Sequence, residues 1–175
     1  GDNGLLACWP PLWPMPQFEP SLRRISFPSG AQAYLYSAGE PDSLRGPQHS
    51  HAWCDEIGKW DNAGERAIMA WDNLQLGLRL GVNPQVVATT TPRAVPLVRR
   101  LVTQAGRPGG VLTRGRTQDN ASNLPASFLL NITEQYGGTS LGRQEMDGEL
   151  LTEVEGALWN RAMIDRQRVE VASEP

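Results

Sequence analysis

The chain has 175 residues, of which 39% are hydrophobic and 20% charged, and its formal net charge is −3. This length suits one domain with its own core, and the composition is not that of a disordered chain. The negative charge excludes an overall basic surface for nucleic acid, so any such contact depends on local arginines. The two cysteines form no CxxC pair and the two histidines have no evident third ligand, which argues against zinc.

A β-hairpin is the first regular element expected along the chain. Residues 23–27 and 31–36 both alternate apolar and polar side chains, and Pro28-Ser29-Gly30 between them is a turn signal. A loop rich in Gly and Pro follows over residues 37–50 and carries Arg45. An arginine on such a loop can project into a phosphate site, its own or a neighbour's, where it stabilises developing charge. A plain surface arginine is the simpler interpretation from the residues alone.

A short apolar run, His51-Ala52-Trp53-Cys54, ends in two adjacent carboxylates, Asp55 and Glu56. In a parallel sheet a buried strand is a brief apolar run, and functional groups sit just past its carboxyl end. An Asp there can hold Mg²⁺, directly or through water, and a Glu can orient and polarise the water that attacks a nucleotide. The dipeptide is common, so a solvated turn is the alternative. Cys54 is expected to be a buried apolar residue, which fits a reducing compartment.

A helix, a second strand and a second helix follow this pair. Apolar residues at helical spacing predict a helix from about residue 66 to 80, with Gly81 just past its end. Residues 85–91 predict a buried strand that ends in Thr89, Thr90 and Thr91, and residues 94–102 predict the next helix. This alternation is typical of a parallel α/β sheet. The threonines are also ordinary strand formers, so their clustering alone is weak evidence of function.

The rest of the chain contains fewer signals. Residues 111–117 predict a third strand, Pro125 fits the start of a helix, and residues 139–145 begin another helical stretch. Lys59 is the only lysine, and no GxxxxGK[ST] loop occurs in the chain. If the protein hydrolyses a nucleotide, we therefore expect the phosphate-binding loop to precede Gly1, and we expect this piece alone to be inactive.

Taken together, these segments resemble the large terminase subunit of tailed bacteriophages and gene transfer agents, the motor that packages DNA into a capsid. The resemblance covers almost the whole chain. It rests on Leu44-Arg45-Gly46-Pro47-Gln48-His49, Ala52-Trp53-Cys54-Asp55-Glu56 and Thr89-Thr90-Thr91-Pro92-Arg93, and on residues 33–38, 70–72, 78–81, 113–115, 119–120, 124, 138–139, 141–145 and 156–159.

The resemblance implies a fold and roles for individual residues. The fold would be a RecA-like (ASCE P-loop NTPase) parallel sheet flanked by helices, with residues 1–160 forming part of the ATPase domain. Residues 161–175 would be a linker toward a C-terminal nuclease domain that this chain does not include. Asp55 would be the Walker B carboxylate that binds magnesium, and Glu56 the catalytic base. Residues 89–91 would be the coupling motif, and Arg45 would act in trans on the ATP of a neighbouring subunit.

The resemblance also implies cofactors and partners. The cofactors would be ATP and Mg²⁺. The partners would be double-stranded DNA, the portal protein, the small terminase subunit and further copies of the chain in a ring, with no membrane. The intact protein would act in the cytoplasm of the bacterial host, at the portal vertex of the procapsid, and would also cleave DNA. Two alternatives remain from the residues: a fragment of a helicase-like nucleic-acid motor, or a non-catalytic binding or scaffold domain derived from the same fold.

Overall fold

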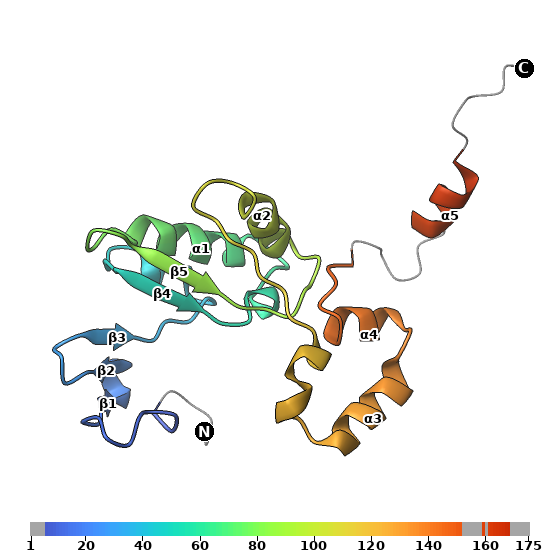
Figure 1. Cartoon of the computed structure of the whole chain (residues 1–175). Coiled ribbons are helices and arrows are strands. Elements are labelled where there is room, and N and C mark those ends of the chain that lie inside the picture. Colours follow the sequence, from blue (N-terminus) through green and yellow to red (C-terminus); the bar gives the residue numbers. More distant parts are fainter. Residues whose placement is uncertain (1–5, 152–158, 160, 169–175) are drawn as a thin grey trace, which may run out of the picture. The chain divides into compact units, whose positions relative to one another are not determined.

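The computed structural model of the chain describes residues 6–151, 159 and 161–168, and it is a mixed α/β structure (Figure 1). The chain divides into two compact units. The first unit comprises residues 1–52 and 60–87, and the second comprises residues 53–59 and 88–175. Strands β4 (His51–Cys54) and β5 (Gln85–Ala88) contribute residues to both.

The first unit begins with a three-stranded antiparallel sheet in the order β1-β2-β3. Strands β2 (Arg24–Ser26) and β3 (Gln32–Tyr34) form the predicted hairpin, and Gly30 adopts a φ of +86° in its turn. Glycine tolerates that conformation because it has no Cβ. Strand β1 (Gln17–Glu19) pairs with the free edge of β2, which the sequence did not predict.

Helix α1 (Arg66–Gly77) packs against the 3-10 turn η2 (Pro41–Leu44) within the first unit. The amide Nδ2 of Asn73 donates a hydrogen bond of 2.9 Å to the carbonyl of Pro41. This contact is mainly apolar, since the side chains of Leu44, Ala67, Ala70, Trp71 and Leu74 are buried there. Burial of such a stripe is the main source of helix stability in proteins.

The predicted helix over 66–80 is confirmed, but it ends at Gly77, three residues before the predicted end. The helix ends at Gly77 because the backbone of His49 forms hydrogen bonds with Gly77 and with the residues that follow it. The N–H of His49 donates to the carbonyl of Gly77 at 2.8 Å, and the His49 carbonyl accepts from the N–H groups of Arg79 and Leu80, each at 3.1 Å. Gly81, with φ of +78°, therefore lies in the following loop and not at the helix end.

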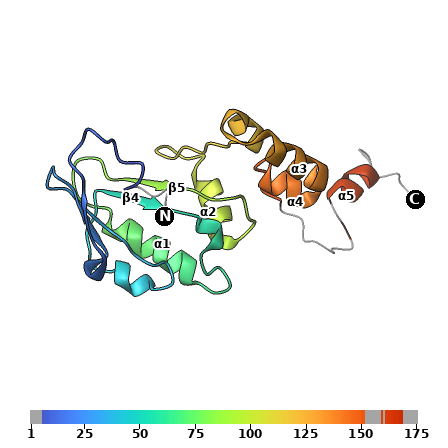
Figure 2. The same cartoon turned by 90° about the horizontal axis from the view of Figure 1, so that it is seen from below.

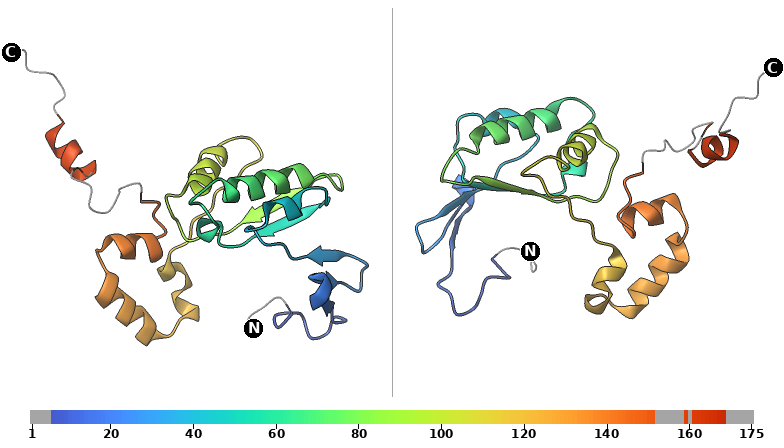
Figure 3. Two further views of the ribbon diagram at one scale, coloured as in Figure 1. Left: turned by 180° about the vertical axis from the view of Figure 1, so that it is seen from behind. Right: turned by 45° about the horizontal axis from the view of Figure 1, so that its top comes forward.

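Strands β4 and β5 form a small two-stranded parallel sheet, with α1 between them in the sequence (Figure 3). The N–H of Gln85 donates to the carbonyl of Ser50 at 3.0 Å, and that of Thr89 to the carbonyl of Cys54 at 2.9 Å. This arrangement confirms the predicted strand–helix–strand order. The prediction of a buried strand over residues 85–91 is wrong, because β5 ends at Ala88 and three of its four residues are exposed. Cys54 is buried as expected, with 4% of its surface exposed, and burial raises the pKa of its thiol to about 11.

The second unit contains the remaining helices. The 3-10 turn η3 (Ile57–Lys59) packs against α2 (Pro96–Gln104), and Ile57, Leu97 and Val98 are buried. The 3-10 segment η4 (Thr117–Asn123) leads to α3 (Ala126–Tyr136), which follows Pro125 as predicted. Helix α4 (Ser140–Glu145), also predicted, packs against α3 (Figure 2), and α5 (Arg161–Gln167) ends the described chain.

The third strand predicted over residues 111–117 is wrong. Residues 111–116 are exposed and belong to no strand. A strand requires a ladder of hydrogen bonds to a neighbour, and the backbone bond at the end of this stretch runs instead from the N–H of Thr117 to the carbonyl of Met146, at 2.8 Å. Among the described residues, no helix is long and apolar enough to cross a membrane.

Candidate functional site

The two adjacent carboxylates lie in a tight turn that follows β4 in the second unit. Glu56 has a φ of +49°, in the left-handed region that residues with a Cβ rarely adopt. The turn then continues into η3 and is fixed to the strand-end residues of β5, because the N–H of Ile57 donates to the carbonyl of Thr89 at 3.1 Å. A non-glycine residue held in this conformation costs free energy, and such residues cluster at functional sites.

The threonines that follow β5 bond directly to this turn. The hydroxyl of Thr89 donates to Oδ1 of Asp55 at 2.8 Å. The hydroxyl of Thr90 accepts from the N–H of Gly58 at 2.9 Å and donates to the carbonyl of Thr91 at 2.8 Å. The carboxylates and the threonines, which the sequence singled out separately, are thus joined by the bond from Thr89 to Asp55, and Thr90 adds a bond to the backbone of Gly58 in the same turn.

Gly58 leaves no room for a side chain at this junction. A Cβ on Gly58 would lie 2.6 Å from Oγ1 of Thr90 and 3.2 Å from the carbonyl oxygen of Thr91. The first distance is well inside van der Waals contact. The approach of the η3 backbone to Thr90 therefore depends on glycine at this position.

Glu56 is held by a basic neighbour. Its Oε2 is buried and accepts no hydrogen bond, but Nζ of Lys59 lies 3.2 Å away, three residues further along the chain. The Glu56 side chain keeps 36% of its surface exposed, and that of Lys59 keeps 60%. The carboxylate is therefore partly accessible on one side and paired with an ammonium on the other.

Arg45 lies in the first unit, at the end of η2. Its side chain is 73% exposed, and Nη1 lies 4.0 Å from Oδ1 of Asp42. Gly46, which follows, has a φ of +101°. Arg45 is thus presented on a loop, as predicted, and its role in trans stays a prediction.

The carboxylates fit a magnesium ion that is shared with a nucleotide. No group of three or more His, Cys, Asp or Glu residues that could hold a metal occurs in the described part of the chain. Mg²⁺, however, commonly uses one or two carboxylates and completes its shell with water and substrate phosphates. Asp55 is exposed and already oriented by Thr89, so the residues present suit that arrangement.

The sequence did not predict the roles of Gly58 and Lys59 in this site. Lys59 was singled out only as a lysine without a phosphate-binding loop. Its spacing of three residues from Glu56 was the available signal, since residues three apart meet within one helical turn. For Gly58 the signal was a glycine two residues after the carboxylate pair. Neither spacing is specific without the backbone turn at Glu56.

The chain matches the model of a known protein family. The family described as "Terminase large subunit, T4likevirus-type, N-terminal" matches residues 15–166, which is most of the chain. Comparisons with curated proteins and with solved structures gave no match. The match covers both carboxylates, the three threonines and Arg45. The chain therefore belongs to the large terminase subunit family, whose role is DNA packaging, and corresponds to its N-terminal region.

Proposed function

We propose that this chain supplies the carboxylate half of an ATPase centre that drives double-stranded DNA into a procapsid. The observation that carries the proposal is the direct bond from the Thr89 hydroxyl to Asp55, within a turn whose next residue is Glu56. It joins the proposed metal-binding carboxylate, Asp55, to a hydroxyl at the ends of two parallel strands, and the proposed base, Glu56, is the residue after Asp55. The carboxyl ends of parallel strands are where α/β proteins bind nucleotides. We infer a RecA-like core on the same grounds.

Each residue would have a distinct task. Asp55 would hold Mg²⁺, which when bound screens the charge of the nucleotide phosphates. Thr89 orients the Asp55 carboxylate through its hydroxyl. Glu56 would accept a hydrogen bond from the attacking water and orient it for an in-line displacement. That task requires an oxygen free of the ammonium of Lys59, which now lies 3.2 Å from Oε2.

The structural change caused by hydrolysis would be transmitted to the rest of the motor through Thr90. Its hydroxyl bonds to the backbone that follows Glu56, so a movement of this turn changes the position of residues 89–91. Arg45 would add a positive charge to the active site of a neighbouring copy of the chain in a ring. The portal protein and the small terminase subunit would be further partners, in the cytoplasm of the host at the portal vertex.

Magnesium-dependent nucleotide binding tests this proposal. The protein would be expressed with the coding sequence that precedes Gly1, and ATP binding measured with and without Mg²⁺. We expect binding to depend on Mg²⁺, and Asp55→Asn to remove most of that dependence. Asp61→Asn is the matched control, since Asp61 is an exposed aspartate six residues away from Asp55. Among its contacts, its Oδ2 lies 4.0 Å from the guanidinium of Arg66.

Two results would favour the alternatives. Strand separation by this longer protein, without packaging or DNA cleavage, would indicate a helicase-like motor. Absence of ATP binding in any protein made from the complete reading frame would indicate a non-catalytic binding or scaffold domain.

A further inference from the structure

The two carboxylate oxygens of Glu56 have different surroundings. Oε2 is buried, accepts no hydrogen bond, and lies 3.2 Å from the ammonium nitrogen of Lys59. The side chain as a whole nevertheless keeps 36% of its surface exposed. The accessible face of the carboxylate is therefore the one that carries Oε1. A water molecule can approach Oε1 while Oε2 stays against the protein.

The backbone of η3 places Lys59 beside Glu56. The N–H of Lys59 donates to the carbonyl of Glu56 at 2.8 Å, which is the bond of a 3-10 turn. Side chains three residues apart in such a turn lie over one another. The two N–H groups between them are also fixed, since Ile57 donates to a carbonyl and Gly58 to a hydroxyl of the threonines that follow β5. The same contacts that hold the turn thus set the spacing of the ion pair.

A second carboxylate close in sequence does not take the ammonium of Lys59. Asp61 is the next acidic residue after Glu56 in the chain. Its Oδ2 lies 4.0 Å from the guanidinium of Arg66, on the other side of it in the sequence. The ammonium of Lys59, the only lysine, is paired with Glu56.

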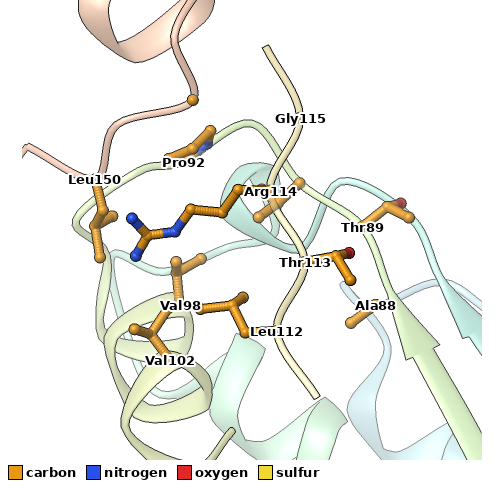
Figure 4. Close-up of a pocket in the computed structure, with 12 residues that line it drawn as sticks. Ala88, Thr89, Pro92, Val98, Val102, Leu112, Thr113, Arg114, Gly115 and Leu150 are labelled. Atoms are coloured by element: carbon orange, nitrogen blue, oxygen red, sulfur yellow. The ribbon is translucent and has the colours of Figure 1, made fainter. Parts of the chain in front are cut away.

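The neighbouring cavity does not supply another cation to Glu56. It has a volume of about 270 Å³, and its walls include Thr89 but neither Glu56 nor Lys59 (Figure 4). The arginine of its wall, Arg114, points toward Leu150 and away from Thr89 (Figure 4). Arg114 therefore does not replace Lys59 at the carboxylate.

Removal of the ammonium would change the direction in which the carboxylate points. A charged oxygen that is buried without a hydrogen bond or an opposite charge is unfavourable. Without Lys59, Oε2 of Glu56 would turn toward water, and Oε1 would turn with it because both belong to one planar group. A carboxylate that orients a water molecule works best when its accepting oxygen is held in one direction.

We propose that Lys59 is a positioning residue, which holds Oε2 of Glu56 so that Oε1 faces the attacking water. The proposal rests on the proposed function, in which Glu56 orients that water. Lys59 touches neither the nucleotide nor the water in this arrangement. Its effect should therefore appear in the rate of hydrolysis and not in the binding of ATP.

The ion pair is measured by NMR in the 175-residue chain, without any nucleotide. Because Lys59 is the only lysine, labelling of lysine with carbon-13 gives a single Cε signal. An ammonium held in one place makes the two Hε protons on that carbon inequivalent, whereas free rotation averages them. We expect two resolved Hε signals that merge in Glu56→Gln and stay resolved in Asp61→Asn. Merged signals in the unsubstituted chain would overturn the proposal.

ATP turnover by the protein that includes the coding sequence before Gly1 measures the consequence. Lys59→Met keeps the length of the side chain but not its charge, and should lower kcat about fivefold while KM for ATP stays within about twofold. Lys59→Arg restores the charge and should recover most of the rate. Arg66→Met is the matched control, because Arg66 is 64% exposed and Lys59 60%, and it should keep the full rate. Lys59 is exposed, so its variants should fold, which circular dichroism checks.

The Glu56→Gln variant separates this proposal from the proposed function. In that background Lys59→Met should cause no further loss, since the residue through which Lys59 acts is already changed. A slow Glu56→Gln protein together with a Lys59→Met protein of full or higher rate, or of raised KM, would overturn the role of Lys59 and leave the proposed function standing. A Glu56→Gln protein of full rate would overturn both, whatever the lysine signals show.

Discussion

The backbone N–H of Gly58 donates to the hydroxyl of Thr90 at 2.9 Å, across 32 positions of sequence. This bond ties the turn that carries Glu56 to the threonines after β5. It is possible only because Gly58 has no Cβ, which would lie 2.6 Å from the same oxygen. Together with the bond from the Thr89 hydroxyl to Asp55, this bond links the proposed hydrolysis site to the proposed coupling motif.

Gly58→Ala should therefore destabilise the protein and uncouple the two segments. The added methyl group forces the backbone and Thr90 apart, at a cost of about 1–3 kcal/mol. Urea unfolding measures the change. Gly106→Ala is the control, because a Cβ there meets nothing within 4 Å, and it should change the free energy of unfolding far less.

The double variant tests whether the effect acts through Thr90. Thr90→Ala removes the oxygen that the new methyl group meets, so the losses from Gly58→Ala and Thr90→Ala should sum to more than the loss in the double variant. Strict additivity would show that the two residues act independently, contrary to this account.

The protein with Glu56→Gly should be more stable to unfolding than the protein with Glu56→Ala. At its φ of +49° alanine keeps the steric cost of a Cβ, whereas glycine does not. After subtraction of the entropy that glycine loses on folding, Glu56→Gly should exceed Glu56→Ala in stability by about 0.5–1 kcal/mol. Both variants remove the ion pair with Lys59, so that contribution cancels. If the alanine variant is the more stable, the left-handed conformation is not imposed by the fold.

Arg45→Ala should leave the fold intact and remove the activity of the ring. Its side chain is 73% exposed, and the distance of 4.0 Å between its guanidinium and Asp42 is that of a weak surface pair. We therefore expect a stability change of less than about 0.5 kcal/mol. In an assembled ring of the longer protein, Arg45→Ala should abolish ATP hydrolysis but spare ATP binding. Mixing it with Glu56→Gln subunits should restore some activity if the arginine acts in trans. No restoration at any ratio would contradict that role.

His49 should make the first unit less stable at acid pH. Burial lowers the pKa of His49 below its usual value of 6.5, its Nε2 has no hydrogen-bond partner among the described residues, and its ring lies edge-on to Tyr36 at 5.5 Å. The unfolded chain then takes up a proton at higher pH than the folded chain does. The stabilising contribution is thus present above pH 6.5 and is lost as pH falls from 6.5 through the lowered folded pKa.

The measurement is the thermal midpoint of unfolding between pH 7.5 and 5. His49→Gln should flatten the fall over this range, because glutamine does not titrate. His51→Gln is the control, since His51 is exposed and should leave the fall unchanged. An unaltered pH profile in His49→Gln would assign the fall to other groups.

The sequence singled out Asp55 and Thr89 separately, because each follows a short predicted strand, and the hydrogen bond between them was not predicted. The pairing of Glu56 with Lys59 and the contact of Gly58 with Thr90 were not predictable, since both depend on the left-handed turn at Glu56. Alternation over residues 111–117 was misleading for a similar reason. It describes which side chains share a face, but a strand exists only where a neighbour supplies its hydrogen bonds. The end of α1 likewise depended on His49, a residue distant in sequence.

The most direct test of the central claim is ATP turnover by the longer protein with Glu56→Gln. Glutamine keeps the size of the side chain but cannot act as a base, so the rate should fall by roughly a hundredfold or more while ATP still binds. Glu65→Gln, an exposed glutamate before α1, should keep the full rate. If the Glu56→Gln protein hydrolyses ATP as fast as the unsubstituted protein, Glu56 is not the base and the proposed ATPase centre is wrong.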